Sequence, residues 1–338
     1  MKFVLPHGGY GLGNDLIPWA KGFILAQELG ATLLHPAWGN NSRHYHRYFK
    51  TFRYDYLVYR LLRRGLPRYR FPEQDYRDLG LNDFAESCAA FMKMKGLDKK
   101  KAFIVEITGF WGAFRGLSSA RSFIIASLLN TAYTQENLYF LSKHLSERRI
   151  TIGVHIRLGD FRPAGGYTYA GIEQAAIPIE WYEYLFKSLE TELGSSNVQW
   201  VLCSDGRPEQ LGRLLGRANV TFASGLGHSD ISDLLLLARS DLLICSISSY
   251  SMWAAFLSAA PYIWYRPNLV EATEGRVNRF IRSLGVNTEW SREGGVAGRA
   301  VALNTGDVLP VHLLGHLQMR RRLKDLGRDL VLGGAVAT

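Results

Sequence analysis

The second half of the chain alternates short apolar runs with amphipathic segments, and this rhythm constrains the fold more than any other feature. Apolar runs typical of strands occupy 151–157, 198–205, 219–223, 241–246 and 261–265. Segments with helical spacing follow them, at 178–193, 207–217, 230–240, 249–259 and 273–284. Repeated strand–helix alternation is typical of a parallel sheet covered by helices on both faces. The sequence therefore predicts an α/β domain over 150–338.

The first half opens in the same way. A strand at 2–6 and a glycine loop at 7–15 precede a helix at 16–30 and a strand at 31–36, and later segments predict a strand at 102–109, mostly helix over 118–148 and a basic helix at 312–332. Of the 338 residues, 47% are hydrophobic and 21% charged, which suits two domains with real cores and argues against disorder. We place the boundary where the rhythm changes, giving domains at 1–149 and 150–338.

The segment 43–71 departs from this pattern, because nine Arg or Lys residues and nine Tyr or Phe residues alternate there around a single Asp55. We expect a helix or an excursion from the sheet. Arginines beside aromatics suit single-stranded nucleic acid, an anionic membrane surface or an ordinary solvated face. The net charge of +10 favours an anionic partner without choosing among these.

The three cysteines are far apart and two of them lie in apolar strand-like runs, so neither a disulfide framework nor a zinc site is expected. The apolar part of MKFVLPHGGYG is too short for a signal peptide, and no apolar run reaches the roughly 18 residues of a membrane span. We expect a cytoplasmic protein, with a peripheral position at the inner face of the membrane as the alternative.

Four polar clusters follow predicted strands. They are GGYGLGN in the first loop, HIRLGD from residue 155, CSD at 203–205 and SISSYS at 246–251. Ligands of open α/β sheets bind outside the carboxyl ends of the strands, so this shared position favours a binding site. His155 and Arg157 alternate with apolar residues and therefore leave their strand on one face.

These residue types suit an anion. Glycines that open a helix can bind phosphate through backbone N–H groups. Arg157 offers a planar charged fork, and His155 a donor whose charge changes near neutral pH. Hydroxyls at a helix start, here Ser248, Ser249 and Ser251, donate together with the free N–H groups. Without an Asp-X-Asp pair we predict no metal site, and the charge of Arg157 would replace the metal.

Each cluster also has a purely structural interpretation. The glycines suit a tight turn, and Arg157 can pair with Asp160 to fix a loop. Ser204 with Asp205 can cap the following helix, as can one of the later serines.

In order along the chain, these motifs resemble those of the fucosyltransferase superfamily. GGYGLGN resembles its G-G-L-G-N or G-R-F-G-N loop, VHIRLGDF its V-H-[IV]-R-R-G-D-Y motif and LCSD its F-S-D strand end. IPIEWYEYLFKSL is similar to the helix that follows the arginine motif. DLLLLARSDLLICSISSYSMWAAFLS is similar to the signature of the bacterial α-1,2-fucosyltransferases.

The resemblance implies a GT-B fold, in which two Rossmann-like domains face each other across a cleft. The domain at 1–149, with its excursion 43–71, would hold the acceptor. The domain at 150–338 would bind the nucleotide sugar, with its terminal helix packing back on the first domain. The implied reaction is an inverting, metal-independent transfer of a sugar from a GDP-sugar, typically GDP-L-fucose, to a hydroxyl of a glycan, as in polysaccharide biosynthesis.

The resemblance also implies roles for single residues. Arg157 would hold the β-phosphate, and Asn14 with Gly11 and Gly13 would complete the phosphate pocket. His155 and Asp205 would face the guanine–ribose end. Ser248, Ser249, Ser251 and Tyr250 would lie around the phosphates. Tyr250 stands where the family has phenylalanine. For the base that takes the acceptor proton, Asp160 is the first candidate and Glu173 the second.

Several positions depart from the family pattern: Asp15, Leu158, Ile247 and Met252. Leu158 replaces the second arginine of the family motif, so the donor could be a GDP-sugar other than GDP-L-fucose. It also motivates an alternative, a non-catalytic nucleotide- or glycan-binding protein of the same fold. The +10 charge motivates a second alternative, a nucleic-acid-binding protein. A lipid-linked glycan acceptor would suit the basic segment 43–71.

Overall fold

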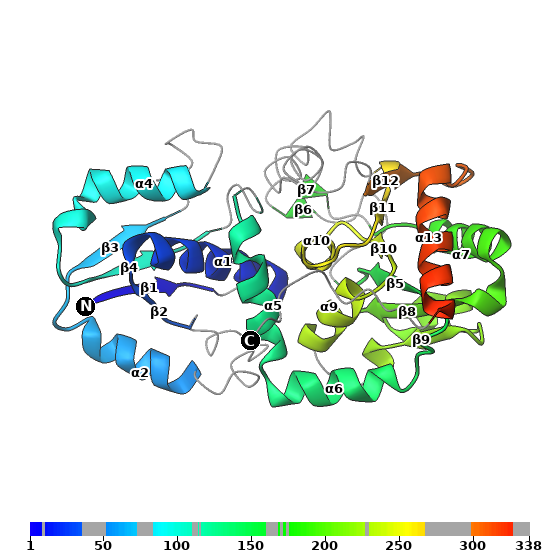
Figure 1. The fold of residues 1–338 in the computed structure, drawn as a ribbon, viewed down its shortest axis with the longest axis horizontal. Coiled ribbons are helices and arrows are strands. Elements are labelled where there is room, and N and C mark those ends of the chain that lie inside the picture. The colour runs from blue at the N-terminus through cyan, green and yellow to red at the C-terminus, as the bar shows by residue number, and fades with distance from the viewer. Residues whose placement is uncertain are drawn as a thin grey trace. The chain divides into compact units, whose positions relative to one another are not determined.

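The structure is a computed structural model that describes residues 1–8, 11–35, 52–72, 84–109, 114, 116–159, 168–169, 172–173, 176–226, 230–267 and 299–326. These residues form two compact units, which divide between Tyr133 and Thr134. Each unit is built on its own parallel sheet (Figure 1). The α/β class predicted from the rhythm of the sequence is therefore confirmed.

The sheet of the first unit has the strand order β2-β1-β4-β3, with all neighbours parallel. Its strands are β1 (Lys2–Pro6), β2 (Thr32–Leu33), β3 (Arg68–Phe71) and β4 (Phe103–Ile107). Its helices are α1 (Leu12–Leu29), α2 (Phe52–Leu62), α4 (Phe84–Lys95) and α5 (Arg121–Leu129). The helix α6 (Ala132–Ser142) begins at the division between the units.

The sheet of the second unit has the order β12-β11-β10-β5-β8-β9, again with all neighbours parallel. Its strands are β5 (Ile150–Ile156), β8 (Val198–Ser204), β9 (Val220–Phe222), β10 (Leu242–Cys245), β11 (Tyr262–Tyr265) and β12 (Ala300–Leu303). The chain runs outward from β5 to β9, returns to β10 on the other side of β5, and continues to β12. This is the strand order of a Rossmann fold, and its switch point lies between β5 and β10.

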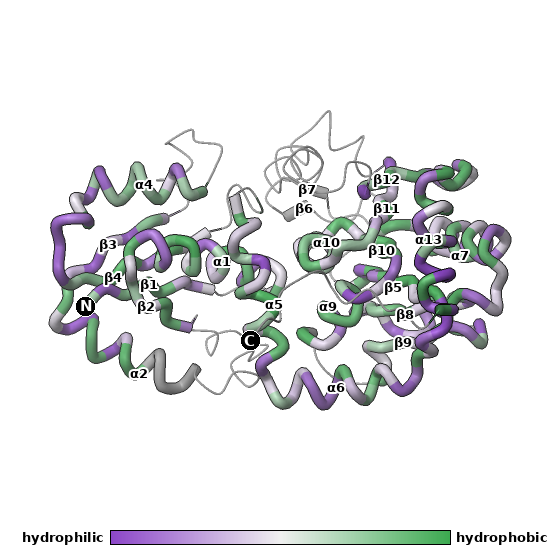
Figure 2. Tube along the Cα trace, in the orientation of Figure 1, coloured by the Kyte–Doolittle hydropathy of each residue, from purple (hydrophilic) through white to green (hydrophobic). Residues whose placement is uncertain are grey.

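Helices α7 (Ile179–Leu193), α8 (Pro208–Leu211), α9 (Asp230–Ala238), α10 (Ser249–Leu257) and α13 (Val311–Asp325) belong to this second unit. A small antiparallel pair, β6 (Thr168–Tyr169) and β7 (Ile172–Glu173), stands apart from the main sheet. Figure 2 shows hydrophobic colour along α10, whose residues from Ser251 to Leu257 are buried. The sheet is therefore enclosed in the way a parallel sheet requires.

The alternation in β5 separates its two faces. Ile150, Ile152, Val154 and Ile156 pack in the core with residues of α7 and α13. On the opposite face, a Cβ on Gly153 would lie 2.6 Å from Ser240 Oγ at the end of α9. Glycine at 153 thus admits the close approach of α9, and His155 emerges next along the same face.

The C-terminal helix α13 is held to its own sheet. Leu313 and Leu317 lie in the core, while Arg320 and Lys324 contact the buried Asp241 at 2.7 and 3.0 Å. Asp241 also accepts the backbone N–H of Thr151 at 2.9 Å. The terminal helix was predicted at 312–332, and its last part, 327–332, lies outside the described residues. Its predicted return to the first domain stays a prediction.

Some predicted boundaries were wrong. The first helix begins at Leu12 rather than at 16, directly after Gly11, which is extended. The predicted helix 207–217 is broken at Gly212, whose φ of 48° ends α8 after Leu211. Strands β3 and β12 and helix α4 were not predicted, and the predicted helix at 273–284 lies outside the described residues.

The segment 43–71 contains α2 and then β3, so its described part is a helix followed by an edge strand of the sheet. The three cysteines are buried and free. Among the described helices, none combines the length and the apolar character needed to cross a bilayer.

Candidate functional site

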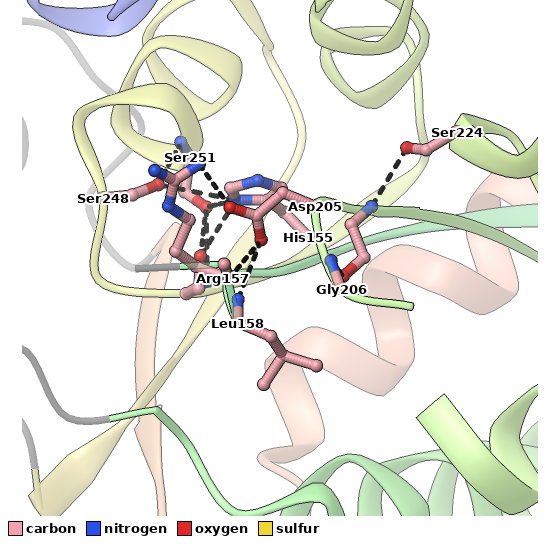
Figure 3. Close-up of polar contacts among 11 residues, drawn as sticks. His155, Arg157, Leu158, Asp205, Gly206, Ser224, Ser248 and Ser251 are labelled. Carbon is pink, nitrogen blue, oxygen red and sulfur yellow. Dashed lines mark hydrogen bonds and ion pairs between the residues drawn. The ribbon is translucent and has the colours of Figure 1, made fainter. Parts of the chain in front are cut away.

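The polar residues predicted at strand ends in the second unit meet at one place. The carboxyl ends of β8, β5 and β10 are adjacent in the sheet, and His155, Asp205 and the serines after β10 lie there (Figure 3). A Rossmann-type sheet binds ligands at this position, because the helices on either side of the switch point diverge. The strand order thus supplies the reason for the convergence.

His155 is the centre of the cluster and is only 7% exposed. Its Nδ1 atom lies 2.7 Å from Ser251 Oγ, 2.9 Å from Ser246 Oγ and 3.4 Å from Ser248 Oγ. Its ring also contacts Tyr250, with centroids 4.9 Å apart. Hydroxyls can both donate and accept, so either neutral tautomer of the ring is satisfied at Nδ1.

The pKa of His155 is lowered to about 3, mainly by burial and then by the positive charge of Arg157, while the charge of Asp205 acts in the opposite direction. His155 is therefore neutral at physiological pH. The sequence-based expectation of a charge that changes near neutral pH was wrong, because desolvation penalises the imidazolium form.

Arg157 and Asp205 form the charged part of the cluster. Arg157 NH1 lies 2.6 Å from Asp205 Oδ2, and the two side chains are 20% and 31% exposed. Asp205 Oδ1 accepts the backbone N–H groups of Leu158 and Gly159, at 2.8 and 3.1 Å. One carboxylate thus fixes both the guanidinium group and the backbone that follows it.

Leu158 and two glycines pack around the Arg157–Asp205 pair. The Leu158 side chain points away from the polar cluster (Figure 3) and packs against the core of the second unit. A Cβ on Gly159 would lie 2.5 Å from Asp205 Oδ2, and one on Gly206 would lie 2.6 Å from Leu158 Cδ1. A side chain at either position would therefore displace Asp205 or Leu158 from the position described.

Asp205 and Ser204 do not cap the following helix. Ser204 Oγ accepts the N–H of Gly206 at 2.9 Å, and at the start of α8 the Arg207 N–H donates to Gln210 Oε1 at 2.8 Å. Ser204 N–H donates to Ser224 Oγ at 3.0 Å, and Ser224 donates to Asp233 at 2.7 Å. Sequence reasoning missed both roles: Ser224 lies in no motif, and Asp233 opens the stretch DLLLLARSDLLICSISSYSMWAAFLS but was not singled out.

The serines after β10 divide into separate roles. Ser248 caps α10 by accepting the N–H of Ser251 at 3.2 Å. Ser251 is fully buried, and its Oγ accepts the N–H of Ser246 at 3.2 Å while contacting His155. Ser249 and Tyr250 are half-buried at the start of the same helix. Ser246, the first residue after β10, belongs to the predicted SISSYS cluster but was given no role of its own.

The glycine-loop residues predicted for the site lie in the first unit. Gly11 precedes α1, and its carbonyl accepts the N–H groups of Asn14 and Asp15, both at 3.0 Å. Gly13 is buried within the first turn, and Asn14 Oδ1 is a buried atom without a hydrogen-bond partner among the described residues. A Cβ on Gly8 would lie 2.9 Å from the buried Asp15 carboxyl group, so a side chain there would displace that carboxyl group.

Both candidates for the base fall largely outside this description. Asp160 lies outside the described residues, and of Glu173 only the backbone in β7 is described. In the part of the chain that the structure describes, no group of three or more His, Cys, Asp or Glu side chains could hold a metal ion.

Chemically, the cluster offers a guanidinium group, hydroxyls and a helix N-terminus within one polar surface. Positive charge and donors of this kind favour an oxyanion such as a phosphate group. The class defined by fold and site is therefore an α/β protein with a Rossmann-type second unit and a polar, anion-suited cluster at its switch point.

No family profile matches the chain, and no curated protein matches it either. Among solved structures, the NodZ α-1,6-fucosyltransferase of Bradyrhizobium, soaked with GDP-fucose, is 17% identical, with 76% of this chain and 92% of that chain covered and a TM-score of 0.46. FUT1 of Arabidopsis thaliana in complex with GDP is 13% identical, with 79% and 71% covered and a TM-score of 0.45. POFUT1 in complex with GDP-fucose is 11% identical, with 76% and 95% covered and a TM-score of 0.48.

Proposed function

We propose that the chain is a glycosyltransferase of the fucosyltransferase superfamily with a GT-B arrangement of its two units. It transfers a sugar, L-fucose in the first place, from a GDP-sugar to a hydroxyl of a glycan. The observation that carries the proposal is the convergence of His155, Arg157 and Asp205 on the start of α10 at the switch point of a Rossmann sheet. Those residues belong to the motifs that resemble the superfamily.

Arg157 stabilises the leaving group. As the sugar departs through an oxocarbenium-like state, negative charge grows on the β-phosphate, and most of the catalytic stabilisation goes to that charge. One N–H of Arg157 stays with Asp205 at 2.6 Å, and the guanidinium group has further donors for phosphate oxygens. Asp205 thereby fixes the guanidinium in advance and faces the guanine–ribose end of the nucleotide.

The start of α10 completes the phosphate contacts. Ser249 donates its hydroxyl there, and the helix N-terminus adds favourable partial charge. Ser251 acts through His155, because its Oγ already contacts the His155 ring and the Ser246 N–H. Ser248 fixes the first turn as its cap, and Tyr250 packs on the His155 ring.

In the first unit, Gly11, Gly13 and Asn14 are the residues that we propose to contact a phosphate group. The buried Asn14 Oδ1 without a hydrogen-bond partner among the described residues supports a polar contact at this loop. Transfer proceeds with inversion. It needs no metal, because Arg157 and the donors at α10 stabilise the negative charge of the diphosphate that a metal ion would otherwise neutralise. Asp160 and Glu173 stay as proposed candidates for the base.

Leu158 also bears on which sugar is transferred. Its side chain packs in the core, so the second arginine contact of the family motif has no counterpart at this position. Fucose remains the first donor to test, and other GDP-sugars are tested beside it.

The acceptor is a glycan, and a lipid-linked one suits the surface around α2. Leu57, Val58 and Leu61 are exposed on this helix. Arg60 on the same helix, and Arg63 and Arg64 directly after it, are also exposed. Exposed aliphatic groups among arginines favour an anionic lipid surface. Sedimentation with phosphatidylglycerol vesicles tests this contact, which Leu61→Ser should weaken and Tyr139→Ser, on α6, should not.

Two alternatives remain. A non-catalytic protein of the same fold would bind GDP without turnover, and a nucleic-acid-binding protein would bind oligonucleotides in a salt-sensitive way. The first draws on Leu158 and the second on the +10 charge.

Thermal-shift and turnover assays decide among them. Selective stabilisation by GDP among nucleoside diphosphates, with GDP release from GDP-L-fucose in the presence of EDTA, is the expected result. The anomeric configuration of the product by NMR tests inversion. Binding of GDP without release in the presence of any glycan selects the non-catalytic alternative, and oligonucleotide binding without GDP binding selects the nucleic-acid one.

A further inference from the structure

The first unit has a switch point of its own, and the roles above do not use the polar side chains that lie there. In its sheet β2 lies on one side of β1, and β4 and β3 lie on the other. Open α/β sheets bind ligands at such a point, outside the carboxyl ends of the strands. His7 directly follows β1, and Glu106 is the penultimate residue of the neighbouring strand β4. Both side chains therefore start from the position at which the first unit is expected to bind a ligand.

Glu106 gathers several polar side chains around it. Its own side chain is only 6% exposed, and a carboxylate buried to this extent requires compensating partners. Tyr59 on α2 donates its hydroxyl to Glu106 Oε1 at 2.9 Å. Arg68 NH1 lies 3.5 Å from Oε1, and Arg70 Nε and His7 Nε2 each lie 3.7 Å from Oε2. One buried carboxylate thus brings two guanidinium groups and an imidazole together.

The two arginines are exposed and only loosely held by Glu106. They alternate along the edge strand β3, so their side chains leave it on one face, with Arg70 paired in register with Glu106. The side chains of Arg68 and Arg70 are 45% and 79% exposed. Their separations of 3.5 and 3.7 Å exceed the roughly 2.7–2.9 Å of a charge-assisted hydrogen bond, which leaves N–H donors for another oxyanion. Two positive charges against one negative charge make this surface cationic.

His7 adds a hydrogen-bond acceptor to this surface. Its Nε2 atom is fully buried and faces Glu106, although the side chain as a whole is 35% exposed. Burial lowers the pKa of His7 from its usual value near 6.5, while the charge of Glu106 raises it and that of Arg70 lowers it, so the ring is neutral at pH 7. A neutral ring in this position carries its proton on Nε2, next to the carboxylate, and presents the lone pair of Nδ1 outward. The exposed edge of the ring therefore suits a hydroxyl donor.

We propose that the first unit binds an acidic glycan at this site, through a sugar residue that carries a carboxylate or a phosphate group. Arg68 and Arg70 donate to the oxyanion. His7 Nδ1 accepts a hydrogen bond from a hydroxyl of the same sugar. A neutral sugar lacks the oxyanion, and free sulfate lacks the hydroxyl, so each satisfies only part of the site. The choice of a glycan rests on the proposed function, whereas the binding itself involves the first unit alone.

Ligand-observed NMR titrations of the full chain test the site. The probes are the methyl glycosides of glucose, galactose and mannose, each as the neutral sugar, the uronate and the 6-phosphate, together with sulfate. Saturating GDP occupies the Arg157 site, and titrations of Arg157→Ala without GDP provide the same separation by a second route. We expect at least one acidic sugar to bind about tenfold or more tightly than its neutral counterpart, as one charge-assisted contact allows, and more tightly than sulfate.

Two variants assign the contacts. Arg70→Gln should lower the affinity for that acidic sugar about tenfold and leave its neutral counterpart unchanged, because only the oxyanion contact is lost. Arg70 is 79% exposed, so the replacement leaves the fold intact. Arg148→Gln, at an exposed position before β5, is the matched control and should change neither affinity. His7→Ala should weaken binding of the acidic sugar and leave sulfate unaffected, since sulfate has no hydroxyl to donate.

Equal affinities for every acidic sugar and its neutral counterpart, or no binding of any of them, would overturn the inference. It would also be overturned by acidic-sugar binding that Arg70→Gln leaves unchanged, or by sulfate binding as tightly as the acidic sugar. The proposed function fails on a different result, which is the absence of GDP binding or turnover in the wild-type chain. The effect of Arg70→Gln on sugar binding can still be measured in that case, so the two failures are distinguishable.

Discussion

Two serines that are close neighbours in sequence offer a sharp test, because the structure gives them different surroundings. Ser251 is fully buried, with its Oγ 2.7 Å from His155 Nδ1 and 3.2 Å from the N–H of Ser246. Ser249 is half-buried at the first turn of the same helix. Sequence resemblance assigns both to the phosphates, whereas the geometry leaves only Ser249 for that contact.

The expected magnitudes follow from these contacts. Ser251→Ala removes one buried hydrogen bond and leaves the Ser246 N–H without its acceptor, which together cost about 2–3 kcal/mol of the free energy of unfolding. Ser249→Ala lies at a position of partial exposure and should cost no more than about 0.5 kcal/mol. In the donor complex, Ser249→Ala removes a hydrogen bond to a charged group and should weaken GDP binding about tenfold or more.

Urea unfolding measures the first quantity and calorimetric titration with GDP the second. Equal losses of stability in the two variants would refute the description of the His155 cluster. A Ser249→Ala variant with wild-type affinity for GDP would refute the assignment of Ser249 to the phosphates.

Two further predictions concern stability. The pKa of His155 is about 3 in the folded chain and near 6.5 when unfolded, so its contribution is complete above pH 6.5 and is lost as the pH falls toward 3. Between pH 7 and pH 5 the wild type should lose about 2 kcal/mol more than His155→Asn, and urea titrations that fall in parallel would contradict this. Asp241→Asn should destabilise the second unit by about 3 kcal/mol, because Arg320 and Lys324 lose a buried carboxylate at 2.7 and 3.0 Å. Hydrogen exchange should show the loss in α13, and an unchanged α13 would contradict the packing described above.

Much of the second unit was predictable because a buried parallel strand has a strong sequence signal. The apolar run of β5 and the alternation that sets His155 and Arg157 on one face both follow from a period of two. The meeting of the strand ends follows from the general property of open α/β sheets. The order of the strands, by contrast, is a property of the whole sheet and is not written in any one segment.

The contacts within the site were less predictable. Asp205 was expected to cap a helix or face the ribose, and its bonds to the backbone of Leu158 and Gly159 depend on how two loops approach. The neutral state of His155 depends on burial that no local pattern specifies. In the first unit, Glu106 appears in the sequence as one residue of a strand, and its partners on α2 and β3 lie 36 to 47 positions away.

The most direct test of the central claim is a calorimetric titration of GDP into the wild-type chain and into Arg157→Ala. The account predicts selective binding of GDP by the wild type and a loss of affinity of about 10- to 100-fold in Arg157→Ala, the cost of one charge-assisted contact to phosphate. Failure of the wild type to bind GDP, or equal affinity in the two proteins, would contradict it.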